Sequence, residues 1–250
     1  MTDSSGDRRV FTGSRKVRLG DVTVAGRLRL DALTRYTQDV SDDDTTDAGL
    51  AADPGWVVRR TVVRQRTPAV FGETIEISTS CSGLGRRWAE RELQVVGDEG
   101  ARYEVVTLWI CVDPVTGRPA ALTDQFLGIY GASAGGRSVT ARLTNPKLPD
   151  NEPDLDRWPW PLRVADFDTL GHVNNAAYWT VVEELMAAAW APVGSAFDAT
   201  MEYSAGLGSN DDVTIVTASS GGRCQAWWST ATDTVAASVF VNAAASPPVD

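Results

Sequence analysis

The chain has 250 residues, of which 43% are hydrophobic and 22% charged, and its formal net charge is −10. This length suffices for one large domain or two small ones with cores of their own, and the negative charge argues against nucleic acid as a partner. No apolar run is long enough to span a bilayer, and residues 1–16 are too polar for a signal peptide. We therefore expect a cytoplasmic protein without a membrane span.

Cysteine and histidine are too scarce for most metal sites. The three cysteines, Cys81, Cys111 and Cys224, form no CxxC pair, and His172 is the only histidine. Because structural zinc sites draw their ligands mainly from these residue types, the sequence predicts no metal and no other cofactor. The cysteines are expected to be reduced thiols, as is usual in the cytosol.

The first half of the chain predicts a short extended piece, a turn, a helix and then strands. The extended piece covers 15–22, and the weak apolar face of the helix consists of Leu30, Leu33, Thr37 and Val40. The acidic run 42–44 is expected to help end this helix. Four β-rich runs follow, at 55–66, 73–84, 86–97 and 102–113.

Signals of regular structure weaken between the two halves. Residues 131–136 are mostly small, and prolines crowd the stretch that ends at 161. We interpret 123–160 as a linker that crosses from one half to the other. The predicted units are then 10–122 and 161–245.

The second half repeats the pattern of the first, with an extended piece at 160–167. The apolar face of its helix consists of Tyr178, Val181, Val182, Leu185, Met186 and Ala189, and strand signals follow at 199–206, 211–220, 224–233 and 234–243. A shift of 145 residues places Asp21 on Asp166, Gly26 on Gly171, Leu28 on Val173 and Gln38 on Glu183. One helix followed by several antiparallel strands, twice, predicts α+β halves in which a curved sheet wraps a central helix.

The segment ADFDTLGHVNNAAYW, at 165–179, contains the only histidine. In the structural interpretation, Asp168 is the N-cap of the second helix and His172 is a first-turn residue that binds it. In the functional interpretation, Asp168 is a general base or nucleophile and His172 orients it or carries a proton. The residues alone leave both open.

With both halves taken together, the chain resembles the acyl-acyl carrier protein thioesterases, which are double hotdog proteins of plastid and bacterial fatty-acid biosynthesis. The hallmark GHVNN is intact at 171–175. The remaining resemblance rests on 17–40, 56–92 and 108–122 in the first half and on 163–179 and 201–204 in the second.

The resemblance implies an α+β tandem hotdog that hydrolyses acyl-ACP or acyl-CoA to a free fatty acid, with the acyl carrier protein or the acyl-CoA substrate as its partner. It assigns catalysis to the second half and acyl binding to the first. The helix N-terminus after Gly171 is the expected oxyanion site, because main-chain N–H groups there favour negative charge. The expected substrate-binding residues are Trp56, Gly171, Val173, Asn174 and Asn175, although Asn174 and Asn175 equally suit polar packing of the first helical turn.

Two positions depart from the family pattern. Leu170 stands where family members have an asparagine, and Gly206 stands where they have a catalytic glutamate. In the first half, Thr23 and Arg27 take the places of Asp168 and His172, so we expect one active site per chain, near the interface of the halves.

The departures leave an alternative function, a catalytically impaired hotdog protein that binds acyl thioesters without turnover. A hydratase of enoyl thioesters is a distant third, because ADFDTLGHVNN fits the turn of those enzymes poorly. Arginines at 59, 60, 64 and 66 could attract an acidic carrier despite the negative net charge. A homodimer is left open.

Overall fold

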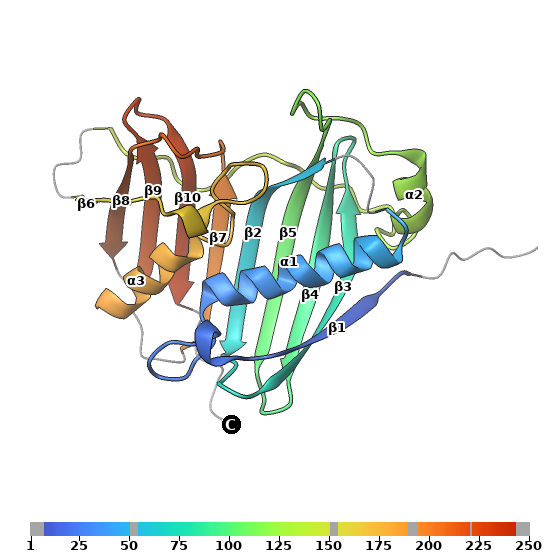
Figure 1. Cartoon of the computed structure of the whole chain (residues 1–250), viewed down its shortest axis with the longest axis horizontal. Helices are drawn as coiled ribbons and strands as arrows, with labels where there is room; N and C mark the ends of the chain where they lie inside the picture. The colour runs from blue at the N-terminus through green and yellow to red at the C-terminus, as the bar shows by residue number, and fades with distance from the viewer. Residues whose placement is uncertain (1–7, 51–54, 151–154, 190–194, 221, 244–250) are drawn as a thin grey trace, which may run out of the picture.

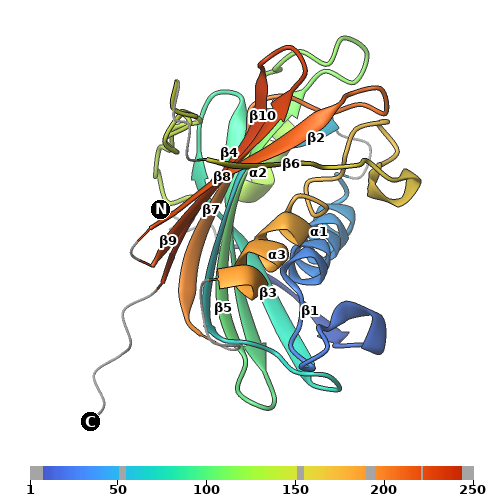
Figure 2. The ribbon, with the colours of Figure 1, turned by 90° about the vertical axis from the view of Figure 1, so that its left-hand side faces the viewer.

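The computed structural model describes residues 8–50, 55–150, 155–189, 195–220 and 222–243. Within these ranges, ten strands form one antiparallel sheet in the order β1-β3-β4-β5-β2-β7-β10-β9-β8-β6. The long helices α1 and α3 lie on one face of the sheet (Figure 1), and the sheet curves around them (Figure 2). This arrangement confirms the predicted α+β double hotdog.

The two halves have the same strand order when each is followed from the outer edge to the centre. The first half consists of β1 (Phe11–Lys16), α1 (Leu30–Asp47), β2 (Gly55–Thr67), β3 (Thr74–Leu84), β4 (Trp88–Gly97) and β5 (Arg102–Val112). The second consists of β6 (Asp156–Pro159), α3 (Trp179–Ala189), β7 (Phe197–Tyr203), β8 (Val213–Ser220), β9 (Arg223–Thr230) and β10 (Val235–Ala243). Strands β2 and β7 pair antiparallel at the centre and join the halves into one sheet.

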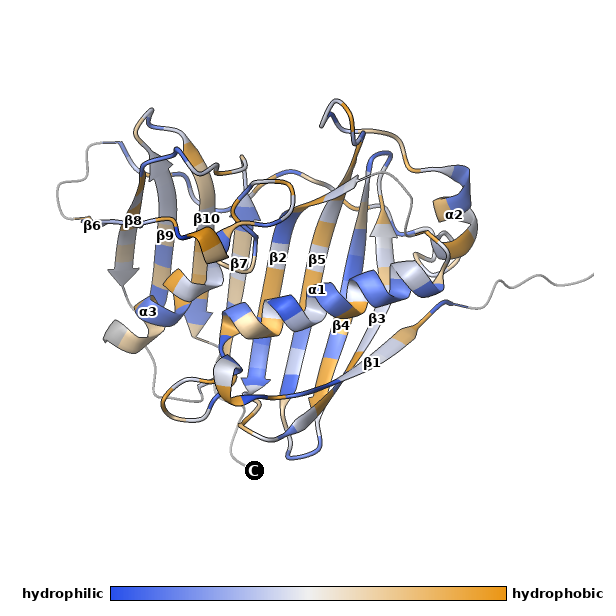
Figure 3. Ribbon diagram, in the orientation of Figure 1, coloured by the Kyte–Doolittle hydropathy of each residue, from blue (hydrophilic) through white to orange (hydrophobic). Residues whose placement is uncertain are grey.

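The core lies between the helices and the sheet and draws on both halves. The predicted apolar face of α1 is buried at Leu30, Leu33, Thr37 and Val40. Polar and apolar residues alternate along the strands and around α1 (Figure 3), as expected for elements with one buried face. Neither these helices nor any other helix in the described ranges combines the length and the hydropathy needed to cross a membrane.

The acidic run does not end the first helix, because α1 continues to Asp47. The reason is Asp44, which is 1% exposed and forms ion pairs with Arg91 and Arg9. The phenol of Tyr130 donates a further hydrogen bond to Asp44 over 2.8 Å. These partners, of which Arg91 and Tyr130 are buried, outweigh the unfavourable position of an acidic side chain near a helix C-terminus.

The predicted linker contains ordered elements. Helix α2 (Asp124–Tyr130) packs into a small cluster of its own with β3, β4 and β5. The buried carboxylate of Glu202, on β7, then accepts the main-chain N–H groups of Thr144 and Asn145. Strand β6 also falls within 123–160, yet it pairs with β8 of the second half. The unit boundaries 10–122 and 161–245 remain our proposal.

Candidate active site

Asp168 and His172 lie at the two ends of a tight loop that precedes α3. The Asp168 N–H donates to the main-chain oxygen of His172 over 2.9 Å, and the Gly171 N–H donates to that of Asp168 over 3.1 Å. An isolated bridge joins Phe167 to Val173 beneath the loop. Gly171 closes the turn at a φ of 74°, in the left-handed region that glycine adopts without strain.

The same loop precedes α1 in the first half. Thr23 N–H donates to the main-chain oxygen of Arg27 over 2.8 Å, and Gly26, at a φ of 78°, donates to that of Thr23 over 2.9 Å. A bridge joins Val22 to Leu28. Each of these residues lies 145 positions before its counterpart, so the repeat inferred from weak sequence similarity is present in the hydrogen bonds of the backbone.

The structure corrects the predicted start of the second helix, because α3 begins at Trp179 rather than after Gly171. Asp168 is therefore not its N-cap. The side-chain oxygen of Asn174 accepts the Ala176 N–H over 2.8 Å and caps the turns that lead into α3. This hydrogen bond agrees with the structural interpretation of Asn174, whereas the Asp168 side chain accepts N–H groups of its own loop.

The first three main-chain N–H groups after Gly171 are already engaged within the protein. Those of His172, Val173 and Asn174 donate to Asp168 Oδ1, Leu207 O and Asp166 O over 3.3, 2.9 and 2.7 Å. These three N–H groups cannot serve as the oxyanion site, and Asn175 is the next residue of the predicted stretch.

The Asp168 carboxylate is held by the loop itself. Its Oδ1 accepts the N–H groups of Leu170, over 2.9 Å, and His172, over 3.3 Å. No described residue donates to Oδ2. Since Asp168 is half-buried and His172 is exposed, the carboxylate is fixed in direction while one oxygen stays available and the imidazole is free to reach solvent.

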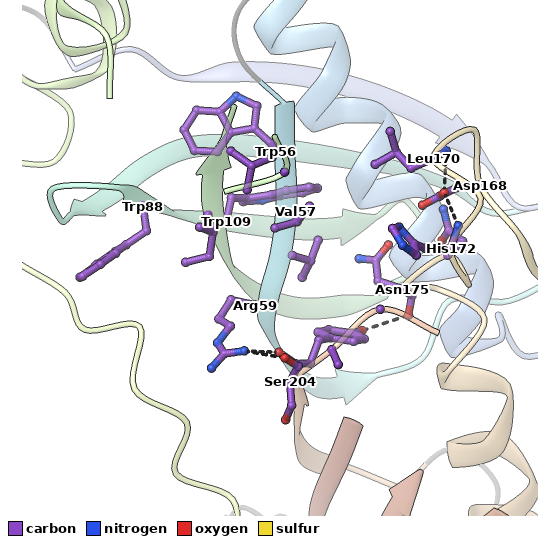
Figure 4. Close-up of a pocket in the computed structure, with 18 of the residues that line it drawn as sticks. Trp56, Val57, Arg59, Trp88, Trp109, Asp168, Leu170, His172, Asn175 and Ser204 are labelled. Atoms are coloured by element: carbon purple, nitrogen blue, oxygen red, sulfur yellow. Dashed lines mark hydrogen bonds between the residues drawn. The ribbon is translucent and has the colours of Figure 1, made fainter. Parts of the chain in front are cut away.

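Both residues line a cleft of about 660 Å³ between the halves of the molecule (Figure 4). Among the described residues that line it, Asp168 is the only carboxylate and His172 the only imidazole. Of the other predicted site residues, Trp56, Val173, Asn174 and Asn175 line the cleft and Gly171 does not. Gly171 contributes its backbone conformation to the loop.

The place of the family's glutamate lies directly against the imidazole. A Cβ built on Gly206 would lie 2.9 Å from His172 Cδ2 and 3.3 Å from its Nε2. Because Gly206 has no side chain, the His172 imidazole can occupy the space that the glutamate would fill. Leu170, in place of the asparagine, is 64% exposed at the rim.

Two of the three glutamates near the motif have structural partners. Glu202 binds the linker, as described above, and Glu183 forms an ion pair with Arg27. Glu183 also accepts the Leu30 N–H over 2.6 Å. Glu184 is exposed and lines a separate groove. None of them replaces the expected glutamate.

Sequence reasoning missed several residues of the cleft, above all Gln38 on α1. Its amide donates a hydrogen bond to Asn175 Oδ1 across the boundary between the halves. The phenol of Tyr203 donates to the Asn175 main-chain oxygen over 3.0 Å, and burial raises the pKa of Tyr203, so this donor keeps its proton. The 145-residue repeat, which places Gln38 on Glu183, was the one signal that singled Gln38 out.

A second cavity of about 330 Å³ lies between α1, α2 and the sheet of the first half. Trp56 and Trp109 line both this cavity and the cleft, so these two indoles form the wall between them. Cys81 also lines the second cavity, and burial raises the pKa of its thiol. The thiol is therefore protonated and acts as apolar lining rather than as a nucleophile.

Of the predicted arginine patch, only Arg59 faces the cleft. Arg64 and Arg66 form ion pairs with Glu104 and Asp198. The Arg59 guanidinium donates instead to the main-chain oxygen of Tyr203 over 2.8 Å and has no carboxylate partner among the described residues. It leaves a local positive charge at the cleft in an otherwise acidic protein.

Comparison with known proteins agrees with this architecture. The acyl-ACP thioesterase N-terminal domain matches residues 8–130, and the acyl-ACP thioesterase C-terminal domain matches residues 153–239. Two uncharacterized proteins from two strains of Mycobacterium tuberculosis are each 32% identical over 209 residues, covering 82% of this chain and 81% of the relative.

Two solved structures share the fold over nearly their whole length. The 12:0-ACP thioesterase from Umbellularia californica superposes with a TM-score of 0.75 and 19% identity, covering 93% of this chain and 96% of that one. An acyl-ACP thioesterase from Bacteroides thetaiotaomicron gives a TM-score of 0.76 and 17% identity, covering 93% and 97%. From its two domain matches, its relatives and its fold, the chain belongs to the acyl-ACP thioesterase family.

Proposed function

We propose that the protein hydrolyses acyl thioesters of acyl carrier protein or coenzyme A to free fatty acids, with Asp168 as the catalytic carboxylate. The observation that carries this proposal is the cleft, in which one half-buried carboxylate, held by two N–H groups, lies beside one imidazole. Thioester hydrolysis needs little more than a base, a water molecule and donors for the developing oxyanion.

In the reaction, Asp168 accepts a proton from water through Oδ2 as the water oxygen attacks the thioester carbonyl carbon. The tetrahedral intermediate then collapses, the C–S bond breaks and the sulfur leaves as a thiolate. His172, exposed at the cleft, supplies a proton to that thiolate and regains one from solvent. Direct attack by the carboxylate, through an anhydride that water then hydrolyses, is the alternative route for the same residue.

The acyl chain has a path into the first half. In the cleft it would lie against the Trp56 and Trp109 indoles, and displacement of these side chains would admit it to the second cavity, whose lining includes Leu50, Ala89 and Phe126. Apolar and aromatic walls of this kind suit a hydrocarbon tail. Arg59 lies at the cleft, where the anionic carrier side of the substrate would enter.

The alternative function is binding without turnover, and the observation that favours it is the replacement of two family residues by Leu170 and Gly206. An assay for free thiol released from acyl-ACP and acyl-CoA distinguishes hydrolysis from binding without turnover. Continuous thiol release by the wild-type protein supports hydrolysis. A substrate-induced rise in melting temperature without thiol release supports the alternative and refutes hydrolysis.

A further inference from the structure

Gln38, on the helix of the acyl-binding half, reaches the catalytic loop of the other half. Its side-chain amide donates to Asn175 Oδ1, and both residues line the cleft together with Asp168 and His172. Figure 4 shows the Asn175 side chain directed into the cavity beside His172. The contact therefore joins α1 to the catalytic centre.

Both oxygens of Asn175 are occupied by donors. Gln38 binds the side-chain oxygen, and the phenol of Tyr203, itself bound by Trp179 Nε1 over 3.2 Å, binds the main-chain oxygen. No described residue accepts from the main-chain N–H or the side-chain amide nitrogen of Asn175. The residue thus presents donors alone, and an oxyanion needs donors.

The residue of the first half that corresponds to Asn175 has a visible partner for its main-chain N–H. A shift of 145 residues places Leu30 on Asn175 and Gln38 on Glu183. In the first half, the Leu30 N–H donates over 2.6 Å to Glu183 Oε1, the carboxylate that reaches across from α3. The same carboxylate pairs with Arg27, which stands in the place of His172. The first-half counterpart of the catalytic site is therefore filled by an anion of the protein itself.

We propose that Gln38 is a positioning residue of the catalytic centre. Gln38 keeps the site of the second half open to substrate, whereas its counterpart Glu183 closes the equivalent site of the first half. Glu183, a carboxylate, occupies the N–H of Leu30. Gln38, a neutral amide, instead holds the side-chain oxygen of Asn175 and leaves the Asn175 donors to the substrate carbonyl. This inference rests on the proposed function, because it assigns the group that binds the thioester oxygen.

Two substitutions of equal length separate positioning from simple packing. Gln38→Met keeps the length of the side chain and removes its donor, so Asn175 loses its fixed direction and kcat falls about tenfold with little change in KM. Gln38→Glu recreates the arrangement of the first half, in which a carboxylate takes the N–H, and lowers kcat at least about a hundredfold. Gln94→Met, at an exposed site on β4, is the matched control and leaves both constants unchanged.

A binding measurement keeps this inference separate from the proposed function. The probes are two pantetheine thioethers that resist hydrolysis, one with a ketone in place of the thioester carbonyl and one without it. We expect wild type to bind the ketone about tenfold more tightly than its counterpart, and both Gln38 variants to lose that preference. The readout needs no turnover, so it holds even where hydrolysis is absent.

The outcomes are distinct. Hydrolysis by Gln38→Glu at the rate of wild type or of Gln38→Met overturns the inference, as does equal binding of the two thioethers by wild type. Where Gln38→Glu fails to fold, the thioether preference of Gln38→Met decides the question. A wild-type ketone preference that both Gln38 variants lose, without any thiol release by wild type, refutes the proposed function and supports the role of Gln38, whereas variants that keep the preference overturn the inference.

Discussion

Substitution of Gly206 by alanine tests whether the space beside the imidazole is functional. The added Cβ would lie 2.9 Å from His172 Cδ2, 3.2 Å from Cγ and 3.3 Å from Nε2. All three separations are shorter than ordinary van der Waals contact. Because His172 is exposed, the imidazole can move away into the cleft, and the backbone need not change.

The size of the effect follows from that displacement. To restore ordinary contact the ring must move by about half an ångström, and a misplacement of about 1 Å in an active site can cost roughly a hundredfold in rate. We therefore expect Gly206→Ala to lower kcat about tenfold. The loss of stability should stay below about 1 kcal/mol, because the moved group is a surface side chain.

The assay is steady-state thiol release from an acyl-CoA, with the melting temperature of each variant measured in parallel. Gly208→Ala is the matched control, since among the described residues the one atom within 4 Å of its added Cβ is Asp211 Oδ2 at 3.9 Å. Equal kcat values for Gly206→Ala and Gly208→Ala, in an enzyme that His172→Ala inactivates, would refute the reasoning.

Three further outcomes are expected. Trp56→Ala should join the cleft to the second cavity and shift the preference toward longer acyl chains, as measured over a series of saturated acyl-CoA substrates. Asp44→Asn should lower the free energy of unfolding in urea by about 3–5 kcal/mol, because it leaves Arg91 buried without its counter-charge. Burial would raise the pKa of Asp31, but hydrogen bonds from two arginines lower it overall. The stability lost in Asp31→Asn should therefore be largest at neutral pH and should disappear as the pH falls through the lowered folded-state pKa.

Strand positions were predictable because alternating and β-rich runs report burial on a sheet directly. The run 102–113, for example, corresponds to β5 within one residue at its end. Helix ends were less predictable because they depend on distant partners. The acidic end of α1 is stabilised by an ion pair between Asp44 and Arg91 on β4, and no local sequence pattern predicts that contact.

The same distinction applies to the candidate site. The GHVNN motif identified the loop residues, since they are contiguous in sequence. It could not show that the loop is a hairpin turn separate from the helix, because Asp168 suits an N-cap and an Asx-type turn equally well. Gln38 contributes from 137 residues away, so only the folded chain reveals its contact with Asn175.

The two halves share one backbone arrangement, so the residues at equivalent positions of their loops can be compared directly. Both halves retain the loop, the helix and the strand order, but Thr23 and Arg27 replace the acid and the imidazole in the first. A backbone that served only as a scaffold would not explain why the second copy keeps Asp168 and His172 at an open cleft. The difference between the copies supports the proposed chemistry in the second half.

The most direct test of the central claim is the rate of thiol release by Asp168→Asn. The amide keeps the size of the side chain and its contact with the loop but cannot take a proton from water. We expect kcat to fall at least about a thousandfold, while affinity for the ketone thioether and the melting temperature stay near those of wild type. A variant that hydrolyses acyl thioesters as fast as wild type would contradict the account.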